Sequence, residues 1–232
     1  MTNLITLKNI SKKYIDNKNI KVLDNINFSF ELGKIYSIIG PSGSGKSTLL
    51  NILSLIDKPT NGSLEILSEK INYNQISKND QIRSEKIGII YQDKNLLNDF
   101  TALENVYLPK LLLTEDKYLS LSEAKKIIKK VGLGSRLNHY PSELSGGENQ
   151  RVAICRSLIN SPQIILADEP TGSLDFANAK EIFKILFDLK NKSRVIIFAT
   201  HNRYFANMAD CKIQLIDGKI KTINERFKKN NI

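Results

Sequence analysis

The octapeptide GPSGSGKS at residues 40–47 constrains the fold most, because it fits the phosphate-binding pattern G-x-x-x-x-G-K-S/T in full. It follows the apolar run 35–39 and precedes the apolar segment 47–56, which predicts a strand, a loop and a helix. Glycines let a backbone approach phosphates closely, and N–H groups at a helix N-terminus attract negative charge. We therefore expect Lys46 to reach the outer phosphates and the Ser47 hydroxyl to face Mg²⁺.

Short apolar runs separated by turns predict further strands. They lie at residues 4–10, 22–30, 87–91, 164–167, 195–199 and 213–216, and a hairpin-like patch covers 62–76. The runs at 164–167 and 195–199 are continuous and aliphatic, as in central strands of a parallel sheet. A helix is expected between them at 176–189, and Asp217-Gly218 is a hairpin turn signal. The pattern predicts an α/β fold.

The middle of the chain, roughly residues 97–155, has a helical pattern. Ser120 and Glu123 fit a capping box, which predicts a helix that starts there. Apolar residues then recur on one face, and four lysines between 125 and 130 fall on the opposite face. We expect Gly132 or Gly134 to end the helix. This region is therefore predicted to be a helical insertion.

Composition narrows the class of protein. The chain has 34 Lys and Arg against 24 Asp and Glu, a formal charge of +10. A basic chain suits nucleic acid, anionic lipid or phosphate partners, but the lysines are scattered, so we expect a solvated surface. No run approaches 18 apolar residues, and no basic segment followed by an apolar run opens the chain, so neither a membrane span nor a secretory signal is expected. Cys155 and Cys211 lack metal-binding spacing and are expected as buried thiols.

Two further segments carry candidate chemistry. The apolar run 164–167 leads into Asp168 and Glu169, at the strand end where ligands bind in open α/β sheets. Asp168 is expected to hold Mg²⁺ and Glu169 to act as a general base on water. Ser145 and Glu148 form a second capping box with two glycines between them, which predicts a second anion site at a helix start.

Together, these segments resemble the nucleotide-binding subunits of ATP-binding cassette (ABC) transporters. The resemblance covers nearly the whole chain, and its motifs occur in the same order as in the family. Residues 144–150, LSGGENQ, are similar to the family signature. It implies a P-loop NTPase fold of the RecA-like type, in which a parallel-sheet core carries an N-terminal antiparallel β subdomain and a helical insertion subdomain. It also implies one domain over residues 1–232, with ATP and Mg²⁺ as ligands.

The resemblance assigns roles to individual residues. Tyr14 looks like the aromatic residue that stacks on adenine, Gln92 like the glutamine that approaches Mg²⁺ and the attacking water, and His201 like the histidine that contacts the γ-phosphate. Because Glu169 and His201 are both present, the chain is expected to be a competent ATPase. The predicted catalytic residues are Lys46, Gln92, Glu169 and His201. The predicted metal ligands are Ser47, Gln92 and Asp168. The predicted nucleotide-binding residues are Tyr14, Gly40, Pro41, Ser42, Gly43, Ser44, Gly45, Lys46, Ser47, Thr48, Ser145, Gly146, Gly147 and Asp175.

The family's geometry implies a partner that is a second copy of the chain. Two copies pack head to tail, and each ATP lies between the phosphate loop of one copy and the signature of the other. Ser145, Gly146 and Gly147 would then contact ATP held at Lys46 of the partner copy. The loop at residues 173–175 resembles the one that crosses to the partner.

Residues 95–109 resemble the family's docking surface for membrane subunits, in the form found in the ATPase of bacterial lipoprotein-releasing systems. Residues 168–175, DEPTGSLD, are similar to the corresponding segment of the same group, with Ser173 where Asn is usual. Tyr91 in place of Phe and Asn149 in place of Gln are further mild departures, and none touches a catalytic role. The resemblance implies a peripheral subunit at the cytoplasmic face of the inner membrane. It would lie under two integral membrane subunits, without direct contact with nucleic acid or the lipid substrate.

Other functions stay open at this point. ATPases of macrolide-efflux and cell-division ABC complexes share much of the docking loop, but their membrane partner is a homodimer. Soluble ABC ATPases that act on ribosomes or nucleic acid would suit the positive charge, yet they usually carry two cassettes or a long coiled coil. A P-loop nucleotide kinase fits the phosphate loop, but the signature segment argues against it.

Overall fold

The computed structural model describes residues 3–14 and 20–225. The chain divides into two compact units. The first comprises Met1–Asp80 and Lys190–Ile232, and the second comprises Gln81–Leu189.

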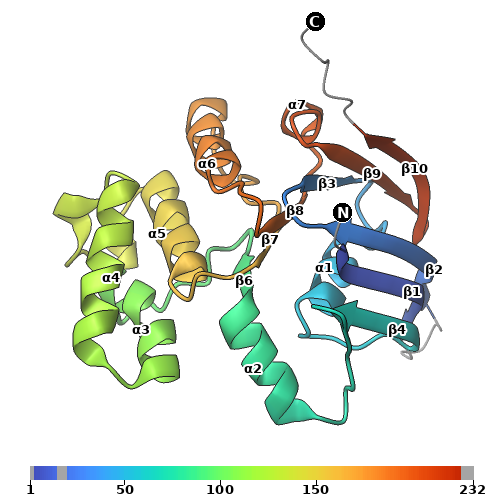
Figure 1. Ribbon diagram of the computed structural model, residues 1–232. Helices are drawn as coiled ribbons and strands as arrows, with labels where there is room; N and C mark the ends of the chain where they lie inside the picture. Colours follow the sequence, from blue (N-terminus) through green and yellow to red (C-terminus); the bar gives the residue numbers. More distant parts are fainter. Residues whose placement is uncertain (1–2, 15–19, 226–232) are drawn as a thin grey trace, which may run out of the picture. The chain divides into compact units, whose positions relative to one another are not determined.

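The first unit contains a four-stranded antiparallel sheet with the order β2-β1-β4-β5 (Figure 1). Its strands are β1 (Asn3–Tyr14), β2 (Ile20–Glu31), β4 (Asn61–Ile66) and β5 (Glu69–Lys70). Apolar side chains of β1 such as Leu7 and Ile10 are fully buried, so one face of this sheet packs into a core. The predicted antiparallel β subdomain is confirmed.

The first unit also holds the strands that carry the phosphate loop. They are β3 (Ile35–Ile39), β8 (Val195–Ala199), β9 (Cys211–Ile216) and β10 (Lys219–Glu225), with β3 parallel to both β8 and β9. Strand β10 returns antiparallel to β9 through Asp217 and Gly218, whose φ angles of 48° and 70° are those of the predicted tight turn. Helices α1 (Lys46–Leu53) and α7 (Arg203–Ala206) also belong to this unit.

The second unit pairs two parallel strands with a group of helices (Figure 1). The strands are β6 (Ile87–Ile90) and β7 (Ile164–Asp168). The helices α3, α4 and α5 pack on a shared apolar core that includes Val106, Ile128 and Val152, which confirms the helical insertion. The helices are α3 (Ala102–Thr114), α4 (Lys117–Lys130), η1 (Gly134–Arg136), η2 (Pro141–Glu143), α5 (Gly146–Leu158) and α6 (Phe176–Asp188).

The start of α4 corrects one prediction. The helix begins at Lys117 because the Asp116 carboxylate accepts a hydrogen bond from the Leu119 N–H at 2.9 Å and caps it one turn early. Ser120 is therefore buried inside the helix, where its hydroxyl donates to the Asp116 carbonyl at 2.7 Å. A capping-box spacing alone does not exclude a stronger cap upstream.

Two more boundaries differ from prediction. The hairpin-like patch ends at Lys70, and a polar helix, α2 (Ile76–Lys86), follows it. This helix lacks the apolar face that sequence patterns detect, and Ile76 itself is exposed. Helix α1 ends at Leu53 instead of Ile56, because Leu55 takes a left-handed φ of 61°.

Several surface and core expectations are confirmed. The four lysines of α4 are exposed, and both cysteines are buried free thiols. Burial raises the pKa of the Cys155 thiol to about 12. In the two described stretches, no helix is long and apolar enough to cross a membrane.

Candidate functional site

The phosphate loop connects β3 to α1 and is held tightly against its own unit. A Cβ on Gly40 would lie 2.1 Å from the Leu215 carbonyl oxygen, so only glycine fits there. Gly45 adopts a φ of 100° as the residue that precedes α1. The Lys46 ammonium donates to the carbonyl oxygens of Gly40 and Pro41 at 2.9 and 3.0 Å. The loop therefore presents a helix N-terminus and a cation to the same small space, which suits phosphate.

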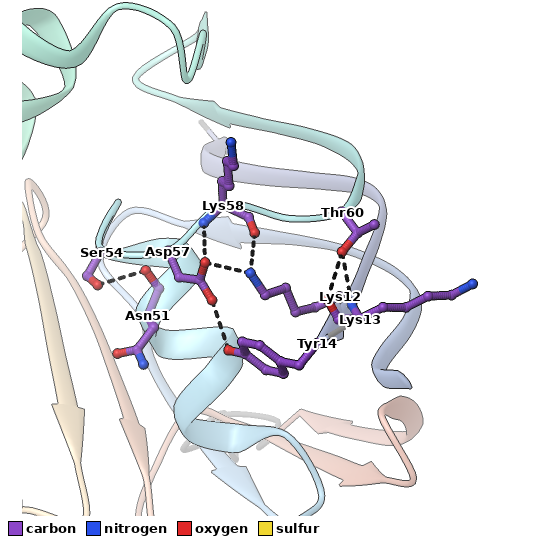
Figure 2. A network of polar contacts seen from close by, with 8 residues as sticks. All are labelled: Lys12, Lys13, Tyr14, Asn51, Ser54, Asp57, Lys58 and Thr60. Carbon is purple, nitrogen blue, oxygen red and sulfur yellow. Dashed lines mark hydrogen bonds and ion pairs between the residues drawn. The ribbon is translucent and has the colours of Figure 1, made fainter. Parts of the chain in front are cut away.

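Tyr14 lies at the end of β1 and is anchored by its neighbours (Figure 2). Its hydroxyl donates to Asp57 Oδ2 at 2.9 Å, and the Lys12 ammonium lies 4.7 Å from the ring centroid. Lys12 also donates to Asp57 Oδ1 at 2.6 Å. Sequence reasoning singled out Tyr14 but missed Lys12 and Asp57, since nothing in the sequence links positions 45 residues apart.

His201 and the phosphate loop follow neighbouring strands of the first unit. Strands β3 and β8 are parallel, and Ile38 pairs with Ala199. The Thr200 N–H donates to the Ile38 carbonyl at 3.1 Å, which fixes the start of the loop after β8. Because parallel strands end at the same sheet edge, the structure brings exposed His201 to the edge that carries Gly40.

Gln92, Asp168 and Glu169 share an edge of the second unit in the same way. Strands β6 and β7 are parallel, with Ile90 opposite Ala167; Asp168 ends β7, and Gln92 and Glu169 follow the carboxyl ends of β6 and β7. A Cβ on Gly172 would lie 3.2 Å from Gln92 Nε2, so the Gln92 side chain lies against the loop after Glu169. Glu169 has a φ of 43°, an uncommon backbone conformation for a non-glycine residue and one that is concentrated at functional sites.

The start of α5 has the capping box that the sequence predicts. Ser145 Oγ accepts from the Glu148 N–H at 3.3 Å, and Glu148 Oε2 accepts from the Ser145 N–H at 2.8 Å. Arg136 Nε donates to Glu148 Oε1 at 3.0 Å. The Ser145 N–H, followed by Arg136 and the Ser145 hydroxyl, lowers the pKa of Glu148 to about 2. The Glu148 carboxylate thus rigidifies this helix start.

Asp175 lies beside the same helix start. A Cβ on Gly147 would lie 2.9 Å from Asn178 Oδ1, so α6 approaches the signature glycines closely. The Asp175 carboxylate caps α6 by accepting from the N–H groups of Ala177 and Asn178 at 2.9 and 3.0 Å. The second unit therefore brings exposed Ser145 and Gly146 near exposed Asp175, whereas Gly147 is buried against Asn178.

The segment after Gln92 is held by contacts that the sequence analysis missed. Arg156 of α5 donates to the carbonyl oxygens of Asn95 and Lys94 at 2.7 and 2.9 Å. The Lys94 ammonium donates to Ser173 Oγ at 2.8 Å. Arg156 also lines a groove of about 380 Å³ together with Tyr91 and apolar residues of β6 and α3. No sequence signal connects these positions, because they meet only through tertiary packing.

Helix α3 begins within the predicted docking segment, and its cap had a sequence signal that was overlooked. Thr101 and Glu104 form a capping box, in which the Thr101 N–H donates to Glu104 Oε2 at 2.8 Å. The buried Asn105 amide accepts from the Leu97 N–H at 2.8 Å and donates to the Phe100 carbonyl at 2.9 Å. These bonds fix the backbone of residues 97–101 onto α3.

Comparison with known proteins gives matches across both units. A family model described as ABC transporter matches residues 23–172. The chain is 46% identical over 219 residues to the lipoprotein-releasing system ATP-binding protein LolD of Rickettsia bellii, covering 94% of this chain and 97% of that protein. It is 43% identical over 234 residues to the protein of the same name from Wigglesworthia glossinidia brevipalpis, covering 99% and 100%. A solved dimeric structure of a post-hydrolysis state of the ATP-binding cassette MJ0796, bound to ADP and Pi, is similar with a TM-score of 0.88 and 38% identity, covering 95% of this chain and 98% of that one.

Proposed function

This chain belongs to the ABC transporter family, and we propose that it is the ATP-hydrolysing subunit of an inner-membrane ABC complex that releases outer-membrane-directed lipoproteins. One observation carries the proposal. A complete phosphate loop and a signature helix start occur in a chain that matches lipoprotein-releasing ATP-binding proteins over 94% and 99% of its length. The phosphate loop supports nucleotide binding, and the extent of the match supports the transport role.

ATP binding would use the phosphate loop of the first unit. Backbone N–H groups of residues 40–47 and the start of α1 surround the phosphates, with Thr48 in the same helical turn. Lys46 leaves the carbonyl oxygens of Gly40 and Pro41 and neutralises the outer phosphates. Tyr14, which is 39% exposed, offers its ring to the adenine base.

Mg²⁺ would complete the phosphate site, and this chain offers it hard oxygen donors. Ser47 has an exposed hydroxyl in the first turn of α1, Gln92 has an amide oxygen, and Asp168 has a carboxylate at the end of β7. Mg²⁺ prefers such donors and is commonly held by few protein groups together with substrate phosphates. When bound, the ion neutralises charge on the phosphate oxygens.

Hydrolysis would use residues that follow the strand ends. Glu169 accepts a proton from the attacking water, and the Gln92 amide orients that water. His201 contacts the γ-phosphate and stabilises the charge that develops on it. The left-handed backbone at Glu169 supports this role, because such conformations of non-glycine residues cluster at active sites.

The complete site would need a second copy of the chain. Ser145, Gly146 and Gly147 form an anion-binding helix start that would contact ATP held by the partner's phosphate loop. The relative MJ0796 has a dimeric solved structure with ADP and Pi, which supports this arrangement. Asp175, beside the signature, would reach the same interface. ATP would then join two copies, and loss of the γ-phosphate would release them.

Membrane subunits would receive the resulting motion at residues 95–109. The backbone of this segment is fixed by Arg156 and Asn105, so a force on it passes directly to α5 and α3. The adjacent groove and the exposed Leu97 and Phe100 supply apolar surface for a partner helix. The chain would lie peripherally at the cytoplasmic face of the inner membrane under two integral membrane subunits, without touching nucleic acid or the lipoprotein's lipid.

The ATPase assignment is tested by Glu169→Gln. We expect ATP binding to persist while turnover falls at least about a hundredfold, because a general base contributes roughly 10²–10⁴-fold. Glu115→Gln is the matched control, since Glu115 is an exposed glutamate that also has a positive φ, of 56°. Steady-state phosphate release and equilibrium ATP binding are measured on both. Turnover by Glu169→Gln close to that of the control would refute the assignment.

A further inference from the structure

The Tyr14 side chain is held by two charged residues for which the proposed function has no role. Tyr14 ends β1, Lys12 lies two residues earlier on the same strand, and Asp57 follows α1 (Figure 2). We propose that Lys12 and Asp57 are positioning residues that fix the Tyr14 ring for the adenine base and so set the preference for adenine nucleotides over bare polyphosphates. The inference rests on the proposed function and deepens it.

The contacts define both the position and the tilt of the ring. Asp57 accepts from the Tyr14 hydroxyl through Oδ2 at 2.9 Å and from the Lys12 ammonium through Oδ1 at 2.6 Å. The Lys12 ammonium is also anchored by the Lys58 carbonyl at 2.9 Å. Because the same ammonium lies 4.7 Å from the ring centroid, the ring is fixed at its hydroxyl and over one face.

Buried Lys12 covers one face of the Tyr14 ring and leaves the other face for a base. Lys12 is only 8% exposed, whereas Tyr14 remains 39% exposed. Because the Lys12 ammonium lies over one face of the ring, the opposite face is the stacking surface for a base. A ring held in its bound orientation loses little freedom when the base arrives, which raises affinity.

The charges that hold the ring are stable near neutral pH. Partial burial of Asp57 opposes its ionisation, but the hydrogen bonds from Lys12, Tyr14 and the Lys58 N–H outweigh this effect and lower the pKa of the carboxyl. The pKa of Tyr14 is raised, first by burial and then by its hydrogen bond to Asp57, so the phenol keeps the proton that it donates. Both partners stay in the protonation state that the contact requires.

Asp57 also ties the ring to the phosphate loop. The Asp57 N–H donates to the Asn51 carbonyl at 3.1 Å, at the end of the helix that Lys46 begins. The base-stacking ring and the phosphate-binding helix start are thereby fixed to a single element, and their separation is set before nucleotide binds.

The test compares a nucleotide with the same phosphates without a base. Calorimetry measures the affinities of the wild type, Asp57→Ala and Lys12→Met for AMP-PNP and for tripolyphosphate. We expect AMP-PNP affinity to fall about three- to tenfold in both variants, a part of the roughly 5- to 150-fold that base stacking contributes. Tripolyphosphate affinity is expected to stay within about twofold. Lys12→Arg keeps a cation at this position, so we expect its AMP-PNP affinity to stay near that of the wild type and above that of Lys12→Met.

Two controls separate positioning from a general loss of structure. Glu65→Ala removes the 2.6 Å Lys8–Glu65 ion pair of the same sheet, which does not involve Tyr14, and is expected to change neither affinity. In a Tyr14→Ala background, Asp57→Ala is expected to cause no further loss of AMP-PNP affinity. Asp57→Asn, which keeps the side-chain volume, repeats the measurement if Asp57→Ala does not fold.

The outcomes distinguish the inference from the function beneath it. Equal loss of AMP-PNP and tripolyphosphate binding, or unchanged AMP-PNP binding in Asp57→Ala and Lys12→Met while Tyr14→Ala weakens it, would overturn the positioning role alone. Unchanged AMP-PNP binding in Tyr14→Ala would overturn the role of Tyr14 in the proposed function. A loss confined to AMP-PNP that disappears without Tyr14 supports the inference.

Discussion

The loss of unfolding free energy on replacing Arg156 follows from the contacts of its side chain. Its guanidinium donates to the carbonyl oxygens of Asn95 and Lys94 at 2.7 and 2.9 Å. A hydrogen bond from a charged donor contributes about 1.5–3 kcal/mol, so the two together amount to roughly 3–6 kcal/mol before any offset. Arg156→Met removes both donors and keeps an apolar stem of similar length.

Two effects reduce this figure. Burial lowers the pKa of Arg156, which means that the folded protein pays a desolvation cost that methionine does not. The released carbonyl groups belong to exposed Asn95 and half-buried Lys94, so water replaces part of the lost hydrogen bonding. The expected loss of unfolding free energy is therefore about 1–3 kcal/mol. Arg156→Lys recovers about half of it, because one ammonium does not reproduce the planar fork.

Urea denaturation measures the loss, and hydrogen exchange locates it. We expect faster exchange of amides in residues 94–97, with exchange in β1 and β2 unchanged. Arg203→Met, at an exposed position of α7, is the matched control and is expected to change the unfolding free energy by less than about 0.5 kcal/mol. A loss in Arg156→Met no larger than that of the control, with unchanged exchange at 94–97, would refute the reasoning.

Two further predictions concern the signature helix start. The lowered pKa of Glu148, about 2 against an ordinary 4.5, gives stability that is fully present above pH 4.5 and lost as pH falls toward 2. The free energy of unfolding of the wild type should therefore exceed that of Glu148→Gln by about 1–2 kcal/mol at pH 6. Urea titrations should show this difference shrinking below pH 4.5, and a difference that stays constant with pH would contradict the lowered pKa. Mixing Lys46→Ala with Ser145→Arg subunits should restore one composite ATP site that neither variant has alone. ATP binding by the mixed dimer no greater than that of either parent would count against a site shared between copies.

Local signals explain what the sequence could predict. The phosphate loop, the Ser145–Glu148 capping box and the Asp217-Gly218 turn each depend on residues within a few positions of one another, and their geometry follows from backbone rules. Strands 35–39 and 195–199 have the predicted bounds, because buried parallel strands read as continuous aliphatic runs.

Tertiary packing decides what the sequence could not predict. Lys12 and Asp57 meet only when β1 lies beside the end of α1, and Arg156 reaches residues 94 and 95 only when α5 lies beside that segment. Helix α2 has no apolar stripe, so periodicity does not reveal it. The predicted cap of α4 is Ser120, but Asp116 caps the helix one turn earlier by accepting a hydrogen bond from the Leu119 N–H.

The most direct test of the transport role is to identify the proteins that copurify with tagged Glu169→Gln from detergent-solubilised host membranes in ATP and Mg²⁺. Mass spectrometry identifies and quantifies them. Two different integral membrane proteins with large periplasmic domains, in equal amounts, are the expected result for a lipoprotein-releasing complex. A single such protein, as in efflux or cell-division complexes, or recovery only with ribosomes or nucleic acid, would contradict it.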